Sequence, residues 1–214
     1  MDSRVLRAVA PYGIGPVAHD GPPGGSGFGA VARELIEHMD CAPRKTGGVV
    51  LITGPSGAGK SSLLGVVRTE LAASGCGVLD ADRVRIPGDR PVAGLARRTP
   101  IRDWLGCLSR AGLADARTFA TRAGDLSVGE TMRLRLALAF AKFESSPSNQ
   151  PRWLLCDEFC SVLDRATSAG VASALHRWAR AAGVRVVVAS AHADLERLVG
   201  PDLIARVEPG GSVL

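Results

Sequence analysis

Residues 49–61 read VVLITGPSGAGKS and carry the clearest structural pattern of the chain. Its first five residues are apolar or β-branched without alternation, which is typical of a strand buried on both faces of a parallel sheet. Gly54 to Ser61 then fit the phosphate-loop pattern in full, and a helical pattern follows over residues 60–73. The glycines let main-chain N–H groups turn inward around phosphates, and the helix directs its positive end at them. The stretch therefore predicts a nucleotide-phosphate site between a strand and a helix.

Two side chains of this motif have predicted contacts of their own. Lys60 is expected to reach the β and γ phosphates, and Ser61 to hold Mg²⁺. The predicted nucleotide-binding residues of this segment are Gly54, Pro55, Ser56, Gly57, Ala58, Gly59, Lys60, Ser61 and Ser62. A phosphate loop alone is shared by many families, including small-molecule kinases of about this length. The second half of the chain has to decide between them.

An apolar run that ends in two carboxylates supplies the next candidates. Residues 153–158 read WLLCDE. Neighbouring side chains of an extended chain point in opposite directions, so the two acids can take different roles. We expect Asp157 to bind Mg²⁺ through its water shell and Glu158 to polarise the attacking water. An acidic pair at a strand end is common, so it does not settle the function alone.

The remaining pattern predicts an α/β fold with a mostly parallel sheet covered by helices on both faces. A third apolar run lies at 184–188, and helical patterns connect these runs. Helices are expected at residues 29–39, 60–73, 101–111, 128–143 and 165–182. Asp164 and Gly183 are plausible caps for the last of them. The glycine and proline content of the first 28 residues predicts an N-terminal arm, and 29–214 a single ATPase domain.

Charge and cysteine content give weaker signals. The net charge of +5 is compatible with an acidic partner such as nucleic acid, but the basic residues are dispersed, which also fits an ordinary solvated surface. Five cysteines without metal-ligand spacing indicate reduced thiols, and core packing is the simplest role for Cys156 and Cys160. No run resembles a signal peptide or a membrane span, so a cytoplasmic protein is expected.

Three further motifs lie in the second half of the chain. Residues 126–130 read LSVGE before a helix, residues 161–164 read SVLD, and His192 follows the last apolar run. Taken alone, the first is a capped helix start and the histidine an ordinary loop residue. Together with the phosphate loop and the acidic pair, over residues 49–198, they resemble the ATP-binding-cassette (ABC) ATPase family. Their counterparts there are the signature, the D-loop and the switch histidine.

The resemblance implies a P-loop NTPase fold with a reduced ABC-type helical subdomain, Mg-ATP as the bound nucleotide and a head-to-tail homodimer. Lys60, Glu158 and His192 would be catalytic, and Ser61 and Asp157 would hold the metal. The family pattern adds four residues to the nucleotide-binding set: Ser127, Gly129, Glu130 and Asp164. The signature residues of one subunit would meet the phosphate loop of the other across the γ-phosphate.

The sequence also departs from the family. A glutamine usually lies between the phosphate loop and the signature, but the only one here is Gln150, and the interval from Lys60 to Ser127 looks shorter than in transporter subunits. The family's adenine-stacking aromatic has only Tyr12 and Phe28 as candidates. Residues 157–167 and Pro201-Asp202 look most similar to soluble ABC ATPases sometimes fused to an acetyltransferase-like domain.

Three functional hypotheses therefore stay open. The leading one is an ABC-type ATPase whose nucleotide-driven dimer acts on a nucleic-acid or protein partner. A nucleotide-binding subunit of a membrane transporter is the second, and the missing glutamine and short interval count against it. A small-molecule kinase is the third, suggested by the loop sequence, but it leaves Ser127, Glu158 and His192 without a shared purpose.

Overall fold

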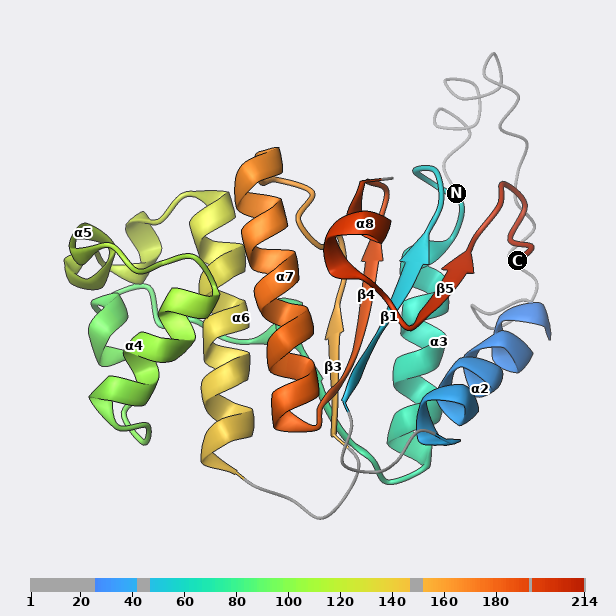
Figure 1. The fold of residues 1–214 in the computed structure, drawn as a ribbon, viewed down its shortest axis with the longest axis horizontal. Helices are drawn as coiled ribbons and strands as arrows, with labels where there is room; N and C mark the ends of the chain where they lie inside the picture. The colour runs from blue at the N-terminus through green and yellow to red at the C-terminus, as the bar shows by residue number, and fades with distance from the viewer. Residues whose placement is uncertain (1–25, 42–46, 147–151, 193, 214) are drawn as a thin grey trace, which may run out of the picture.

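A computed structural model describes residues 26–41, 47–146, 152–192 and 194–213 (Figure 1). Tyr12 and nearly all of the predicted N-terminal arm lie outside this range. Five strands form one sheet in the order β2-β3-β4-β1-β5, and every pairing between them is parallel. Their bounds are β1 Gly48–Thr53, β2 Gly77–Asp80, β3 Arg152–Cys156, β4 Arg185–Ser190 and β5 Leu203–Arg206. The predicted parallel α/β sheet is confirmed.

The central strand β1 is buried on both faces and divides the core in two. Val49 and Leu51 belong to one apolar cluster, whereas Val50 and Ile52 belong to the other. The first cluster lies under α6 (Val128–Ser145) and α7 (Arg165–Ala182). The second lies under α3 (Lys60–Ala73) and α2 (Ser26–Cys41), on the opposite face of the sheet (Figure 1). Period-two alternation thus gives each face of the strand its own helical cover.

A small helical region lies beyond α6 and carries no strand among the described residues. It contains α4 (Ile101–Arg110) and the short α5 (Ala116–Ala120), which Figure 1 shows on the far side of α6 from the sheet. Trp104 and Leu108 of α4 are buried in the same cluster as α6. Single turns of 3₁₀ helix lie in the connections of this region: η2 (Ala81–Arg83) and η3 (Val92–Gly94) between β2 and α4, and η4 (Ala123–Asp125) between α5 and α6.

Most predicted helix bounds hold, and the exceptions have physical reasons. The predicted 60–73 and 165–182 helices match α3 and α7, with Asp164 accepting from the Thr167 N–H and Gly183 ending α7 at φ 61°. The first helix begins at Ser26 rather than residue 29, because Phe28 is buried and extends its apolar face. The short strands β2 and β5 and the helices α5 and α8 (Leu195–Val199) were not predicted. Among the described residues, no helix is both long and apolar enough to cross a membrane.

Candidate nucleotide-binding site

The predicted catalytic segments meet at one edge of the sheet, where the parallel strands β1, β3 and β4 end. A cavity of about 350 Å³ opens there. It is lined by Ser56, Gly57, Gly59, Lys60, Ser61, Ser62, Asp157, Glu158, Ser161, Ser190, Ala191 and His192. Ligands of open α/β sheets bind at this end of the strands. Lys60, Asp157, Glu158 and His192, predicted from separate motifs, therefore share one concave site.

The phosphate loop takes a backbone shape that requires glycine at its first position. Gly54 has φ 147°, and a Cβ placed there would come within 2.1 Å of the main-chain oxygen of Val207. The loop therefore lies directly against the segment that follows β5. Gly59 also has a positive φ, and the edge of the buried Phe28 ring lies behind it. Since that ring packs into the core, Phe28 is not a free surface for adenine stacking.

Lys60 is held by its own loop. Its Nζ atom donates to the main-chain oxygen atoms of Gly54 at 2.9 Å and Pro55 at 2.7 Å. These two bonds use two of the three N–H donors of the ammonium and hold the side chain along the loop. A phosphate oxygen is a charged acceptor and forms a stronger bond with an ammonium than a neutral acceptor does.

The acidic pair lies on a strained turn after β3. Glu158 has φ 42° and Cys160 has φ 61°, values that residues other than glycine adopt infrequently. Two contacts with β4 hold the turn: the Phe159 N–H donates to Ala189 O at 2.9 Å, and Ser190 Oγ donates to Phe159 O at 3.0 Å. Strained backbone of this kind persists where surrounding structure determines it, and it gathers at functional sites.

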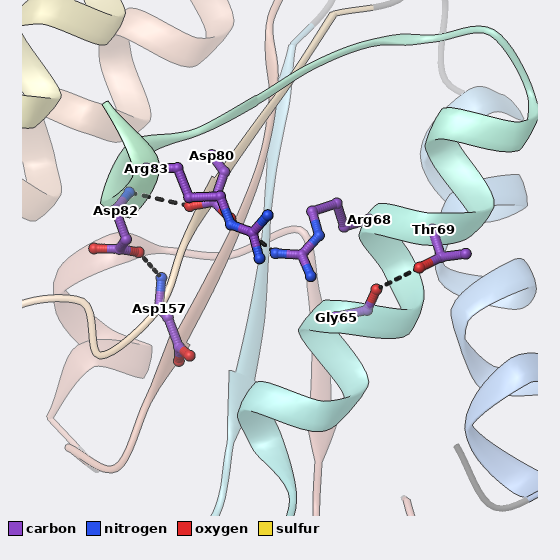
Figure 2. Close-up of polar contacts among 7 residues, drawn as sticks. All are labelled: Gly65, Arg68, Thr69, Asp80, Asp82, Arg83 and Asp157. Atoms are coloured by element: carbon purple, nitrogen blue, oxygen red, sulfur yellow. Dashed lines mark hydrogen bonds and ion pairs between the residues drawn. The ribbon is translucent and has the colours of Figure 1, made fainter. Parts of the chain in front are cut away.

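A second acidic segment, which the sequence did not reveal, adjoins this turn (Figure 2). Asp80 ends β2, and Asp82 lies in the 3₁₀ turn after it. Asp82 Oδ2 accepts a hydrogen bond of 2.8 Å from the main-chain N–H of Asp157. The strand pairing of β2 with β3 brings these residues together across 75 positions of sequence. The available signal was the short run GVLD, an apolar strand that ends in an acid at residue 80.

The carboxyl group of Asp82 has a raised pKa. Neighbouring atoms remove part of the water from its carboxyl, and this desolvation raises its pKa above the ordinary range. The hydrogen bond from Asp157 and the charge of Arg135 oppose that rise, whereas Asp80 and Asp157 add to it. The carboxyls of Asp80, Asp82 and Asp157 therefore lie near enough to one another for their charges to interact.

The signature segment forms a complete capping box at the start of α6. Ser127 Oγ accepts from the Glu130 N–H at 3.3 Å and donates to Glu130 Oε2 at 2.6 Å, and the same oxygen accepts from the Ser127 N–H at 2.9 Å. These bonds lower the pKa of Glu130. None of Ser127, Gly129 and Glu130 lines the phosphate-loop cavity. The plain interpretation, a capped helix start, is confirmed, and any contact with nucleotide stays a prediction.

The D-loop segment packs against the signature of the same chain. A Cβ on Gly129 would lie 3.0 Å from a methyl carbon of Leu163, a close contact that a larger residue could make only if the Leu163 side chain shifted. Asp164 caps α7 through the Thr167 N–H and hydroxyl, which lower the pKa of its carboxyl. Val128 and Val162 are both exposed large apolar residues on these two segments. Asp164, like the signature, does not line the cavity.

The remaining predictions concern His192 and the cysteines. His192 lines the cavity, and its main-chain N–H donates to Ser190 Oγ at 3.3 Å. Cys156 and Cys160 are buried, as their predicted packing role requires. Burial raises the pKa of the Cys160 thiol to about 12 and that of Cys156 well above its ordinary value. These thiols are therefore poor nucleophiles.

The donor set of the cavity fits a magnesium nucleotide. Ser61 and Asp157 line the same cavity as Lys60. Hydroxyl and carboxylate oxygens are hard ligands, and Mg²⁺ is usually bound by one or two carboxylates together with substrate phosphates and water. The described residues contain no cluster of three or more His, Cys, Asp or Glu suited to a metal ion.

The sheet, the loop and the acidic strand end define a P-loop NTPase. Comparison with known proteins gives the family: the AAA ATPase domain model matches residues 30–201, and the chain belongs to that family. The chain is also 28% identical over 185 residues to the lipoprotein-releasing system ATP-binding protein LolD 1 of Rhodospirillum rubrum. That match covers 71% of this chain and 78% of the relative.

Solved structures with a similar fold are ABC cassettes. The dimeric bacterial ABC transporter cassette MJ0796 has a TM-score of 0.58 at 21% identity, covering 78% of this chain and 83% of that chain. A bacterial Atm1-family ABC exporter with ATP bound has a TM-score of 0.55 at 20% identity, covering 77% and 32%. The fold expected from the ABC resemblance is thus confirmed.

Proposed function

We propose that this protein hydrolyses ATP with Mg²⁺ as cofactor. The observation that carries the proposal is the single cavity in which Lys60 and Ser61 of the phosphate loop face Asp157, Glu158 and His192. A phosphate loop supplies binding, but hydrolysis also requires a group that orients water. Glu158, adjacent to the magnesium candidate Asp157, provides such a group.

The position of each cavity residue suggests its role in ATP hydrolysis. Lys60, which its bonds to Gly54 and Pro55 hold at the loop, would donate to the β and γ phosphates. Ser61 and Asp157 would hold Mg²⁺, which would neutralise charge on the phosphates. Glu158 accepts a hydrogen bond from the attacking water and directs it at the γ-phosphorus, and His192 contacts the γ-phosphate. Catalysis by positioning and electrostatics suffices for phosphoryl transfer to water.

The second half of the site is proposed to come from another copy of the chain. Ser127, Gly129, Glu130 and Asp164 lie outside the cavity of their own protomer. The α6 N-terminus offers N–H groups to an anion, and the exposed Val128 and Val162 lie on the segments that would meet the partner. The dimeric structure of the MJ0796 cassette supports this arrangement. ATP binding would close the homodimer, and hydrolysis would open it.

Two kinds of partner could be moved or remodelled by the proposed ATP-hydrolysis cycle. The LolD relative and the transporter cassettes with the same fold favour a nucleotide-binding subunit that operates with a membrane partner. The expectation of a nucleic-acid or protein partner rests on the basic balance of the sequence and gains no support from these relatives. Co-purification of the tagged chain from its native cell, with and without detergent, separates the two. A membrane protein recovered only with detergent supports the first.

Phosphate release measured with purified protein tests the enzymatic proposal. The wild-type chain is expected to release phosphate from ATP only with Mg²⁺. Glu158→Gln is expected to reduce turnover at least about 100-fold while ATP still binds, because it removes the proposed water-orienting group. Lys60→Ala should weaken ATP binding itself. ADP formation that requires an added acceptor molecule, without release of phosphate, would instead indicate a kinase and overturn the proposal.

A further inference from the structure

A hydrogen bond between Asp82 and Asp157 has no part in the mechanism proposed above. Asp82 Oδ2 accepts from the Asp157 N–H at 2.8 Å, so a side chain of one element holds the main chain of another at the start of the acidic turn. Figure 2 shows Asp82 directed toward the backbone of Asp157 from the turn after β2. Asp157 is the candidate magnesium ligand. A hydrogen bond that holds the backbone of Asp157 also restricts the position from which its carboxylate side chain extends.

The other end of Asp157 is fixed as well. Its Oδ1 atom accepts from the Glu158 N–H at 2.9 Å. Among the contacts between described residues, the second carboxylate oxygen, Oδ2, has no hydrogen-bond donor. Residue 157 is thus held at its N–H by Asp82 and at Oδ1 by its own turn, which leaves one oxygen for a ligand from the cavity.

Asp82 is itself placed by a small ionic framework. Asp80 Oδ1 accepts from the Asp82 N–H at 3.0 Å. Asp80 Oδ2 pairs with Arg68 of α3 at 3.1 Å and with Arg83 at 3.2 Å (Figure 2). The framework therefore ties the phosphate-loop helix α3 to the turn that carries Asp82. The same turn contacts α6, the helix that begins at the signature.

We propose that Asp82 is a positioning residue of the ATPase site, which holds the Asp157 N–H and thereby directs the free Asp157 oxygen toward Mg²⁺. The inference rests on the proposed function. Its chemistry is that of an outer-shell partner: Asp82 accepts from the backbone of a ligand residue and does not itself bind the metal. Partners of this kind typically affect metal affinity or activity by about 10–100-fold when they are removed.

A measurement of magnesium-linked nucleotide affinity tests this role. In a Glu158→Gln background, which prevents turnover, the affinity for a fluorescent ATP analogue is measured with Mg²⁺ and with EDTA. The ratio of the two affinities reports how much the metal tightens binding. We expect Asp82→Ala to reduce that ratio by about 10-fold and to leave the affinity in EDTA unchanged. Asp82→Asn keeps an oxygen acceptor for the Asp157 N–H and should retain most of the ratio.

A matched control is Asp89→Ala, an exposed aspartate in the same segment with no hydrogen bond among the described residues. It should behave as the parent protein. An unchanged ratio in Asp82→Ala would overturn the inference, even if the variant melts at a lower temperature, because the contact would then be structural only. An equal loss in Asp82→Asn would also overturn it, since charge rather than the hydrogen bond would matter. Failure of the proposed function is distinct, because the wild-type protein would then release no phosphate from Mg-ATP, whatever the affinity ratio of the Asp82 variants.

Discussion

Ser127 and Lys60 do not share a cavity: Lys60 lines the phosphate-loop cavity, whereas Ser127 lies outside it and donates its hydroxyl to Glu130. Both residues sit at helix N-termini, where main-chain N–H groups favour anions. Only the first has a lysine and a carboxylate pair beside it. In the proposed homodimer, the Ser127 end of α6 from one copy would meet the phosphate-loop cavity of the other copy.

The close contact between Gly54 and Val207 predicts that a methyl group added at Gly54 will destabilise the fold. Gly54→Ala would place a Cβ within 2.1 Å of the Val207 oxygen, in a backbone conformation that alanine rarely adopts. We expect the free energy of unfolding to fall by about 3 kcal/mol, as for other changes that combine a clash with backbone strain. Urea denaturation measures the loss. Gly57→Ala is the control, since its φ is also positive but its Cβ meets open space, and a loss equal to that of Gly54→Ala would contradict the role of Val207.

The buried guanidinium of Arg185 predicts a second cost in stability. Its Nε atom donates to Met39 O at 3.0 Å, it pairs with Asp40 at 3.0 Å, and it lies over the Trp153 ring at 5.5 Å. These contacts attach the C-terminal end of α2 to the sheet. Arg185→Met should lower the free energy of unfolding by about 2–3 kcal/mol, because it leaves a carbonyl without its donor. Arg177→Met, on an exposed side chain, should stay within about 0.5 kcal/mol, and equal effects of the two would refute the attachment.

Carboxylates at the helix starts predict a loss of stability in acid. Hydrogen bonds lower the pKa of Asp115, Glu130 and Asp164 in the folded chain. Their contribution is present above the ordinary pKa of each group and is lost as pH falls through the lowered folded value. The raised pKa of Asp82 acts in the opposite direction, since its contribution is present at low pH and is lost as pH rises.

Asp164→Asn isolates one of these groups, because asparagine also caps helices but does not titrate. The wild-type advantage in stability should be greatest near neutral pH and shrink as the pH is lowered below the ordinary range of aspartate. Denaturation curves at a series of pH values provide the measurement. An advantage that stays constant through this range would show that the charge of Asp164 is not involved.

The buried thiols predict slow alkylation of the folded protein. Desolvation raises the pKa of Cys107 and Cys160 to about 12, and Cys156 is buried beneath the acidic turn. Iodoacetamide at pH 8 should modify these three only as fast as the chain unfolds, as followed by site-resolved mass spectrometry. Denaturant should expose all of them at once. Rapid modification of native Cys160 would contradict the packing of the turn.

The parts of the site that local motifs encode were predictable from sequence. The phosphate loop, the acidic pair and His192 follow three apolar strand runs, and the parallel sheet brings their ends together. Asp82 was not predictable because its role depends on β2, a four-residue strand with no buried residue, which pairing with β3 defines. β5 is likewise short and only partly buried, so its apolar signal was weak.

The helix ends likewise divide into those that local sequence predicts and those that depend on tertiary packing. The caps Asp164 and Gly183 fixed both ends of α7, whereas the start of α2 depended on tertiary burial of Phe28 against Gly59. Packing of that kind joins residues far apart in the chain, and glycines inside the helix gave a misleading local signal. The close approach of Gly129 to Leu163 was invisible for the same reason, although both motifs had been identified.

Light scattering with and without nucleotide tests the two-copy site most directly. Glu158→Gln with Mg-ATP should run as a dimer and should return to a monomer when the nucleotide is removed. Adding Ser127→Arg should keep it monomeric while Mg-ATP still binds, with circular dichroism confirming that α6 remains folded. A Glu158→Gln protein that binds Mg-ATP and stays a monomer, or a double variant that dimerises as readily as the single one, would contradict the account.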